Sequence, residues 1–360
     1  MRTKLIIAAI LVQVLVLGWM AGEREWIVRT APTVWLRTAP VDPQDLFRGE
    51  YVRLNYDIST IPAKLFGPGL KKHMDGLKKR DEGSHHSANR EMVLYTALKV
   101  DPVSGLAEIS TADLTPPASG PFIKGRVRSY WNADQEGLTG VAYGIDAYFV
   151  QQGKASSLER RSPKGMPADI QVPMEMRVAL GSNGTAVLTN HRWNPLGIGV
   201  KIQTQVIPGS IKDPASGRKP VRKIIRVMLG NASATPQAVV LPVDLRTLHI
   251  QHLQNPSGPG EDAALARKDL PPLTDADVRV LQPGETVTVE IDPARAEWFV
   301  KTRPGGPPAQ LGRTDDRYWR FCVTYVPPAA DVCQSLKESV RIARGPMASR
   351  QFGSYELREE

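Results

Sequence analysis

A chain of 360 residues has room for two ordinary domains, and a hydrophobic content of 41% is typical of a chain that folds. The net charge of +9 is dispersed, with acidic residues interleaved, and no basic block has aromatic residues between its cations, which argues against nucleic-acid binding. Gly and Pro contribute 30 residues each, which predicts many turns between short strands and hence a mainly β protein.

The first element predicted along the chain is a membrane helix. Arg2 and Lys4 precede residues 5–21, an apolar run whose only polar side chain is that of Gln13. As a helix, this run would span about 25 Å, close to the thickness of a hydrocarbon core. No small-residue cleavage site and no lipoprotein cysteine follow it, so we expect residues 1–22 to be an uncleaved anchor in the lipid bilayer. The flanking cations predict a single-pass protein of the bacterial inner membrane, with a cytoplasmic N-terminus and a periplasmic bulk.

The segments that follow have the pattern of short strands separated by turns. Residues 51–56 alternate as a half-buried strand does, with Tyr51, Arg53 and Asn55 on one face and Val52, Leu54 and Tyr56 on the other. Other strands are predicted within 26–36, 92–100, 121–128, 142–150, 172–180 and 185–189. Residues 61–90 are predicted to be a long solvated loop with one or two turns of helix. The alternative for this segment is a basic helix that lies on anionic lipid.

A change in composition after Pro195 predicts a domain boundary. We expect a small β-barrel-like domain over 23–195, a linker over 196–220, an immunoglobulin-like β-sandwich over 221–345 and a tail over 346–360. The sandwich is inferred from alternating or apolar segments at 225–229, 239–241, 245–250, 286–291, 319–325 and 336–342, separated by turns.

The two cysteines of the chain are Cys322 and Cys333, eleven positions apart in the region expected outside the membrane. In an oxidising compartment the expected state is one disulfide, worth about 3 kcal/mol. Strand alternation places Cys322 on the outer face of the sandwich. Two unpaired buried thiols are the alternative, because spacing alone does not show that the side chains face each other.

The sequence Gly49-Glu50-Tyr51-Val52-Arg53-Leu54-Asn55-Tyr56 resembles the signature of the bacterial GDYXXLXY family, with Glu50 where the family name has Asp. Segments 41–48, 124–127 and 143–154 also resemble recurring blocks of that family, in the same order. The resemblance covers roughly residues 28–192. It implies an envelope protein with one N-terminal membrane segment, a multi-pass membrane protein as its partner, and no established activity.

Two interpretations of the motif remain open. In the first, it is the founding turn and strand of a small barrel, in which Leu54 and Tyr56 are buried. In the second, it is a shallow site whose arginines recognise an acidic group or a peptide edge, because arginine pairs with carboxylate or phosphate through two hydrogen bonds. The candidate site residues are Arg48, Gly49, Glu50, Tyr51, Arg53, Leu54, Tyr56, Lys124, Arg126, Tyr143 and Gly144.

The sequence contains no recognisable set of catalytic residues. It has no Walker loop, no HExxH, no CxxC and no nucleophile elbow, so we predict no cofactor and no metal site. The expected function is that of a membrane-anchored periplasmic protein that binds or scaffolds an envelope complex. The alternative is a periplasmic hydrolase that acts on envelope material, with its site near Glu50 and Arg53.

Overall fold

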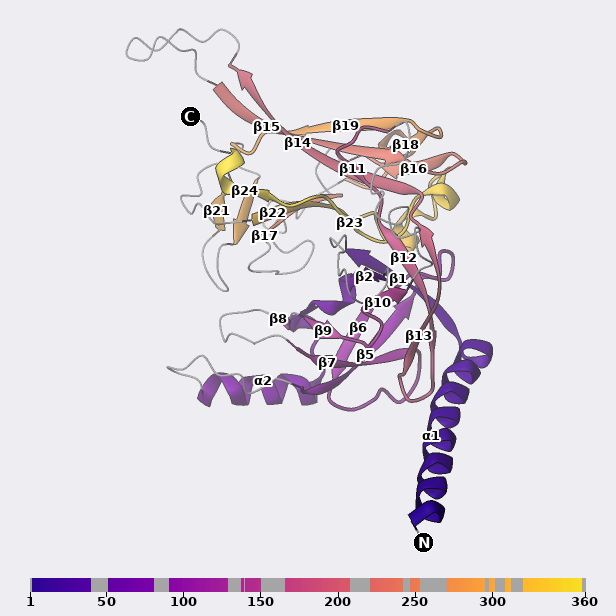
Figure 1. The fold of residues 1–360 in the computed structure, drawn as a ribbon. Coiled ribbons are helices and arrows are strands. Elements are labelled where there is room, and N and C mark those ends of the chain that lie inside the picture. The colour runs from indigo at the N-terminus through magenta and orange to yellow at the C-terminus, as the bar shows by residue number, and fades with distance from the viewer. Residues whose placement is uncertain are drawn as a thin grey trace.

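The computed structural model shows a mainly β protein from which one long helix projects at the N-terminus (Figure 1). It describes residues 2–39, 51–80, 91–128, 137–138, 140–149, 166–207, 221–241, 247–252, 271–294, 298–301, 308–311 and 320–357. The named strands pair antiparallel in several sheets, for example β5 with β6 and β14 with β15. The prediction of a mainly β protein with an N-terminal apolar helix is therefore confirmed.

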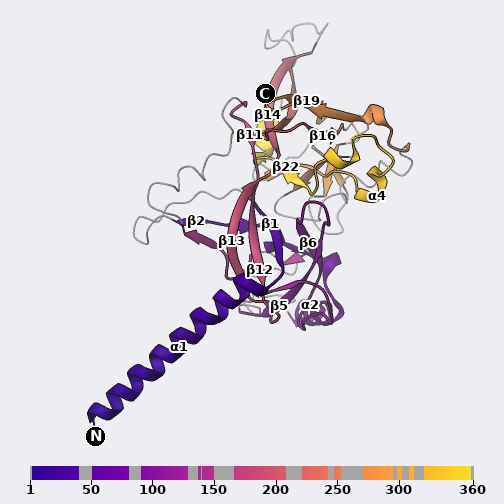
Figure 2. The ribbon, with the colours of Figure 1, turned by 90° about the vertical axis from the view of Figure 1, so that its right-hand side faces the viewer.

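Helix α1 (Arg2–Thr30) extends away from the β fold in both views (Figures 1 and 2). Its side chains from Lys4 to Met20 are exposed, so the helix does not pack on the rest of the protein there. Its length and composition are consistent with a signal anchor or a single membrane span. The helix continues to Thr30, eight residues past the predicted anchor, and stops before Pro32, which has no N–H to continue it.

The N-terminal β region consists of two sheets around one hydrophobic core. The first has the order β13 (Ala186–Trp193), β12 (Met174–Leu180), β1 (Thr33–Ala39) and β3 (Asn55–Tyr56). The second has the order β6 (Ala107–Asp113), β5 (Val93–Val100), β7 (Phe122–Val127) and β9 (Val141–Ala142). Alternate residues from both sheets fill the core, among them Leu36, Leu94, Ile123 and Met176.

Two short strand pairs and a helix complete this region. Strand β2 (Tyr51–Arg53) pairs with β10 (Ala147–Phe149), and β4 (Ile61–Pro62) pairs with β8 (Gly137–Leu138). Helix α2 (Pro68–Arg80) has 13 residues, so it is longer than the one or two turns predicted within a solvated loop. Its side chains Leu70 and Met74 are buried in the core, which explains why the helix forms despite its high charge.

The C-terminal region also places two sheets over one core. The first sheet has the order β11 (Ile170–Gln171), β14 (Leu196–Val206), β15 (Val221–Asn231) and β19 (Thr286–Ile291). In the second, β22 (Arg320–Tyr325) pairs with β17 (Leu248–His252), β23 (Met347–Ala348) and β24 (Phe352–Gly353). Their shared core includes Ile198, Val227, Phe321 and Phe352.

Smaller elements lie beside this core. Strand β16 (Gln237–Val240) pairs with β18 (Val278–Leu281), and β20 (Phe299–Lys301) pairs with β21 (Pro308–Gln310). The short helix α4 (Ala330–Cys333) follows β22.

Besides α2, three segments differ from their predicted structure. Residues 26–30, predicted as part of a strand, form the last turns of α1. Residues 196–206, expected to begin a linker, form β14, whose side chains Leu196, Ile198 and Val200 are fully buried. Their glycine-rich composition suggested a loop, but Gly197 and Gly199 lie where an added Cβ would contact residues 169–172. Residues 339–341 form a 3-10 turn rather than part of a strand.

The predicted disulfide is also wrong, because no bond joins Cys322 and Cys333 in the structure. Cys333 belongs to a small apolar cluster with Val240, Leu336 and Ile342, apart from the core under β22. Cys322 is buried rather than on an outer face, because both faces of β22 are covered. Burial raises the pKa of the Cys322 thiol to about 11, so this thiol is protonated at neutral pH.

Candidate functional site

The described part of the GDYXXLXY-like motif is tied to the segment 143–147 by reciprocal hydrogen bonds. The Tyr56 hydroxyl donates to the carbonyl oxygen of Ile145 at 2.9 Å, and the Tyr143 hydroxyl donates to that of Ile58 at 2.8 Å. Burial raises the pKa of both tyrosines, so both hydroxyls stay protonated and able to donate. The two aromatic side chains therefore brace the fold from inside rather than face a ligand.

Glycines make room for this brace. An added Cβ at Gly125 would lie 2.8 Å from both the Tyr143 ring and the Val141 side chain, closer than real Cβ contacts allow. Gly144 has a φ of +75°, the left-handed region that glycine adopts without strain. Leu54 is buried in the same core. Leu54, Tyr56, Tyr143 and Gly144 thus support the structural interpretation of the motif.

The structure does not assemble the predicted arginine and lysine site from its described residues. Lys124 and Arg126 are exposed on β7, which pairs with β5 and β9, and the Arg126 guanidinium lies 3.2 Å from the exposed carboxylate of Glu91. Tyr51 and Arg53 lie on β2, and only their backbone is described. Arg48, Gly49 and Glu50 lie outside the described residues.

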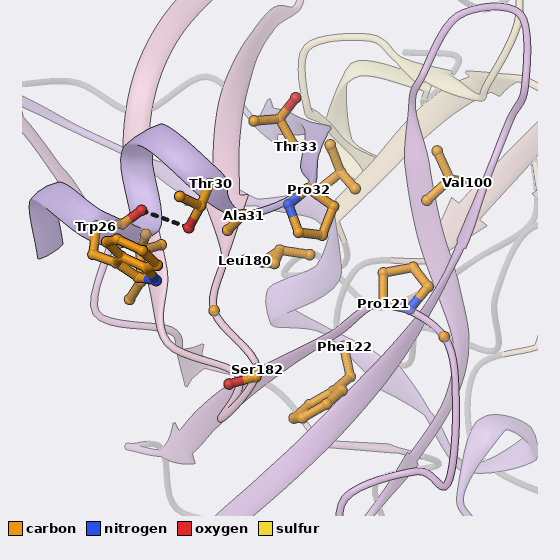
Figure 3. Close-up of a pocket in the computed structure, with 14 residues that line it drawn as sticks. Trp26, Thr30, Ala31, Pro32, Thr33, Val100, Pro121, Phe122, Leu180 and Ser182 are labelled. Atoms are coloured by element: carbon orange, nitrogen blue, oxygen red, sulfur yellow. Dashed lines mark hydrogen bonds between the residues drawn. The ribbon is translucent and has the colours of Figure 1, made fainter. Parts of the chain in front are cut away.

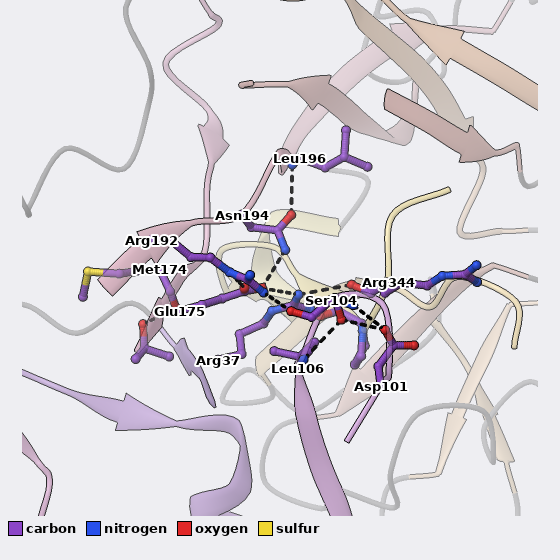
Figure 4. Close-up of polar contacts among 12 residues, drawn as sticks. Arg37, Asp101, Ser104, Leu106, Met174, Glu175, Arg192, Asn194, Leu196 and Arg344 are labelled. Atoms are coloured by element: carbon purple, nitrogen blue, oxygen red, sulfur yellow. Dashed lines mark hydrogen bonds and ion pairs between the residues drawn. The ribbon is translucent and has the colours of Figure 1, made fainter. Parts of the chain in front are cut away.

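Glu175 is the centre of a buried ionic cluster that sequence reasoning missed (Figure 4). Its carboxylate accepts hydrogen bonds from Arg37 Nη2 at 2.8 Å and from Arg192 Nε at 2.7 Å. The amide nitrogen of Asn194 donates to the same carboxylate at 2.9 Å. The Arg192 guanidinium also stacks on the Trp35 ring, 4.1 Å from its centroid. Glu175 and Arg37 are 2% and 5% exposed, so the two charges balance each other away from water.

The same cluster joins the two β regions. Arg37 on β1 also donates to the backbone carbonyls of Arg344 and Pro346 in the segment before β23. Gly345 permits this close approach, because it has a φ of +74° and an added Cβ there would meet Arg37 and Leu106. The cluster is therefore an architectural junction, in which the Glu175 carboxylate and most of the Arg37 donors are used within the protein, while Arg37 Nε has no hydrogen-bond partner among the described residues.

Asp57 is a described carboxyl group whose pKa is raised above its ordinary value. Part of the residue reaches the surface, but the protein packed around the carboxyl group desolvates it and raises its pKa to about 6. The Arg37 charge opposes this rise, and the carboxylates of Glu108 and Glu175 add to it. The Cys322 thiol lies close enough to Asp57 for the Asp57 charge to act on it, but burial raises the pKa of that thiol, so it is not an activated nucleophile.

An apolar groove lies where α1 meets the β fold (Figure 3). Its volume is about 580 Å³, in the range of small-molecule and side-chain pockets. One wall comes from the last turn of α1, with Trp26 and Ile27, and the opposite wall from Pro121 and Phe122 at the start of β7. The base includes Leu180 at the end of β12.

The chemistry of this groove suits binding rather than catalysis. Its described lining residues are apolar, glycine, serine or threonine, and none of them titrates near neutral pH. Trp26 is 70% exposed at the rim, whereas Ile27 is buried and fastens the helix to the turn between β12 and β13. The backbone N–H of Leu180 donates to the carbonyl of Pro32, which fixes the chain just after α1 on the sheet. An exposed aromatic residue at the rim of an apolar pocket is typical of an anchor for a partner side chain.

The sequence carried only faint signals for the groove and the ionic cluster. Trp26 follows the apolar run, which suggested a strand rather than the end of a helix. Glu175 interrupts the apolar segment 172–180, and a carboxyl group between two methionines is the one local sign of a buried charge. Its partners are distant in sequence, at Arg37 and Arg192, so their meeting depends on the sheet order.

Comparison with known proteins identifies one family. The family model described as GDYXXLXY protein matches residues 13–190, which include α1 from Gln13 onward and nearly all of the N-terminal β region. No curated protein and no solved structure shows a significant match to the chain.

The first testable prediction concerns the buried carboxylate. Replacing Glu175 by Gln should lower the free energy of unfolding by about 3 kcal/mol, because Arg37 loses its counter-charge while it stays buried. Urea unfolding of the detergent-solubilised chain measures this loss. The matched control is Glu290→Gln, which breaks an exposed pair with Arg226 and should cost less than about 1 kcal/mol. If Glu175→Gln and Glu290→Gln lowered the free energy of unfolding equally, the ionic cluster around Glu175 would not be the stabilising junction described above.

A second prediction concerns acid stability. Burial alone would raise the pKa of Glu175, but the Arg37 charge, the hydrogen bonds from Arg37 and Asn194 and the Arg192 charge together lower it below its ordinary 4.5. A depressed folded-state pKa stabilises the protein above about pH 4.5, and this contribution is lost as pH falls through the folded-state value. The free energy of unfolding should therefore decrease below pH 4.5, and Glu175→Gln should flatten that decrease. If the free energy of unfolding of Glu175→Gln decreased with falling pH as steeply as that of the parent protein, the decrease would not be due to Glu175.

A third prediction separates the two interpretations of the motif. Tyr56→Phe and Tyr143→Phe should each reduce the free energy of unfolding by about 1 kcal/mol, since each leaves a buried carbonyl without its donor. Tyr95→Phe is the control, because the Tyr95 hydroxyl makes no hydrogen bond with a described residue. Thermal unfolding would show the difference as a lower Tm for the first two variants. If all three variants match the parent protein, the tyrosines are not structural braces.

Proposed function

Because residues 13–190 of this chain belong to the GDYXXLXY family, we propose that the protein is a membrane-anchored envelope protein that binds a membrane partner. In this proposal α1 spans the bacterial inner membrane once, with its N-terminus in the cytoplasm and the β regions in the periplasm. The barrel-like N-terminal domain and the immunoglobulin-like C-terminal sandwich belong to the same proposal. The partner is a multi-pass membrane protein, and the protein acts as a scaffold subunit.

The apolar groove beside α1 is the observation that carries this function. It begins at Trp26, five residues after the apolar run ends at Ala21, so it lies about 8 Å farther along the helix. A groove about 8 Å beyond the apolar run would face the region just outside the hydrocarbon core. Loops and helix ends of a multi-pass protein emerge from the membrane in this region. Its apolar lining matches an apolar side chain or a helix end of such a partner.

A periplasmic hydrolase that acts on envelope material is the alternative function. The raised pKa of Asp57 supports it, because perturbed carboxyl groups gather at catalytic sites. Asp57 follows Tyr56 directly, so it is close in sequence to the predicted Glu50 and Arg53 site. The scaffold takes precedence because the groove offers a formed binding surface, whereas the thiol near Asp57, that of Cys322, is buried and protonated and so is not activated.

The fourth prediction tests the scaffold through the groove. The full chain, purified from its own membranes in mild detergent, should retain one stoichiometric membrane protein. Trp26→Ala should lower that stoichiometry about tenfold or more, because exposed aromatic anchors contribute about 2 kcal/mol at interfaces. Tyr355→Ala is the matched control, since Tyr355 is a comparably exposed aromatic residue near the C-terminal end of the described chain.

Two outcomes would contradict the scaffold. The first is a monomer with no partner that reacts with a broad hydrolase probe, especially if Asp57→Asn abolishes the labelling, because this result supports the hydrolase. The second is a partner that Trp26→Ala and Tyr355→Ala retain equally, because the groove would then play no part in binding it. Circular dichroism of each variant would verify that the fold is intact.

A further inference from the structure

Helix α2 is amphipathic and strongly basic. Leu70 and Met74 point into the hydrophobic core, while Lys71, Lys72 and His73 are exposed on the opposite side. Over its full length the helix sequence carries five cations, Lys71, Lys72, Lys78, Lys79 and Arg80, against the single acidic residue Asp75. Neither Lys71 nor Lys72 has an ion-pair partner in the described part of the chain. The helix thus presents positive charge at Lys71 and Lys72 that no ion pair neutralises among the described residues.

The position of α2 is fixed by its first turn. The carboxylate of Asp113, at the end of β6, accepts hydrogen bonds from the backbone amides of Gly69 at 3.2 Å and Leu70 at 2.7 Å. The Gly67 amide donates to the carbonyl of Ala112 at 2.7 Å. An added Cβ at Gly67 or Gly69 would meet the Asp113 side chain, so both glycines allow this close approach. The basic face therefore has a defined direction relative to the sheet.

That direction places α2 on the side of the fold from which α1 leaves. Figure 1 shows α2 below the sheets and across the direction of α1, at the end opposite to β14, β15 and β19. Figure 2, turned by 90°, again shows α1 and α2 at the lower end of the N-terminal β region. If α1 is a membrane span, this end of the protein faces the bilayer.

The length of α1 beyond its apolar run is compatible with contact between α2 and the membrane surface. Residues 22–30 of α1 continue the helix for about 14 Å beyond the apolar run, and the headgroup layer takes up about 5 to 8 Å of this. The remaining gap is about one Debye length at physiological ionic strength, about 8 Å. A lysine side chain on α2 can bridge much of this gap, so its ammonium group lies within reach of lipid phosphates.

We propose that the exposed basic face of α2 binds the anionic lipid headgroups of the membrane that holds α1. The binding is electrostatic, because the apolar side chains Leu70 and Met74 are used in the core and do not enter the lipid. Two attachments, α1 and α2, then fix the tilt of the β regions over the bilayer. This inference rests on the proposed membrane anchoring, but not on the partner at the groove.

A fluorescent probe on α2 tests the inference. Gly76 lies on the exposed side, and an added Cβ there has open space, so Gly76→Cys accepts an environment-sensitive dye such as nitrobenzoxadiazole. Cys322 and Cys333 are buried in the folded chain and are not expected to react. The labelled full chain is placed in lipid nanodiscs of phosphatidylcholine, with or without phosphatidylglycerol. Dye emission should shift to the blue and brighten with phosphatidylglycerol, and high salt should reverse the change.

Charge reversal provides the matched comparison. Lys71→Glu with Lys72→Glu should reduce the population of lipid-bound α2 roughly tenfold or more, given about one kcal/mol per cation near an anionic surface. Lys201→Glu with Lys223→Glu makes the same change in total charge on β14 and β15, at the opposite end, and should leave the emission as in the parent protein. Lys71→Gln with Lys72→Gln should be intermediate, and covers the case in which the glutamates disturb the helix.

The outcomes separate this inference from the proposed function. If the dye emission does not change with phosphatidylglycerol, or if the Lys71→Glu, Lys72→Glu variant keeps the blue shift, α2 does not bind anionic lipid. An acidic protein would then be the partner to test for the basic face of α2. Failure of the chain to enter nanodiscs would instead overturn the membrane anchor itself. Loss of the co-purified partner in Trp26→Ala, with a normal emission shift, would support the groove and the α2 contact independently.

Discussion

The buried carboxylate of Glu175 is the constraint on which the arrangement of the two β regions depends. It neutralises Arg37, and Arg37 in turn donates to the backbone carbonyls of the C-terminal segment at Arg344 and Pro346. A buried guanidinium without a counter-charge would be costly, so the ionised Glu175 carboxylate stabilises the docking of the C-terminal segment at this position. Hydrophobic packing holds each region together, whereas this cluster sets how one lies on the other.

The same sheet also orients helix α1. β1 follows α1 after Pro32 and lies between β12 and β3, so the helix end is continuous with a central strand. Ile27 and the backbone bond from Leu180 to Pro32 fasten that end to the β12–β13 hairpin. The groove beside Trp26 and the basic face of α2 therefore keep defined positions relative to α1.

Sequence reasoning succeeded where the pattern is local and failed where it depends on distant partners. The alternation of residues 51–56 correctly predicted that Leu54 and Tyr56 are buried, and the apolar run correctly predicted an exposed N-terminal helix. Spacing suggested a disulfide between Cys322 and Cys333, but Cys333 is buried in a small apolar cluster that does not include Cys322, a property of tertiary packing. The hydroxyls of Tyr56 and Tyr143 find their acceptors more than 80 positions away, beyond what strand periodicity can indicate.

The central place of β1 has a consequence for how the chain is made. Its first 39 residues include both α1 and a strand that must wait for its partner, because β12, its long neighbour, begins at Met174. During synthesis, some 130 residues must follow β1 before that neighbour arrives, and closing so long a loop slows folding. The N-terminal sheet is thus completed late although its first strand is delivered early. Until β12 arrives, most of β1 presents an unpaired edge, since its pairing with β3 involves only Thr38 and Ala39.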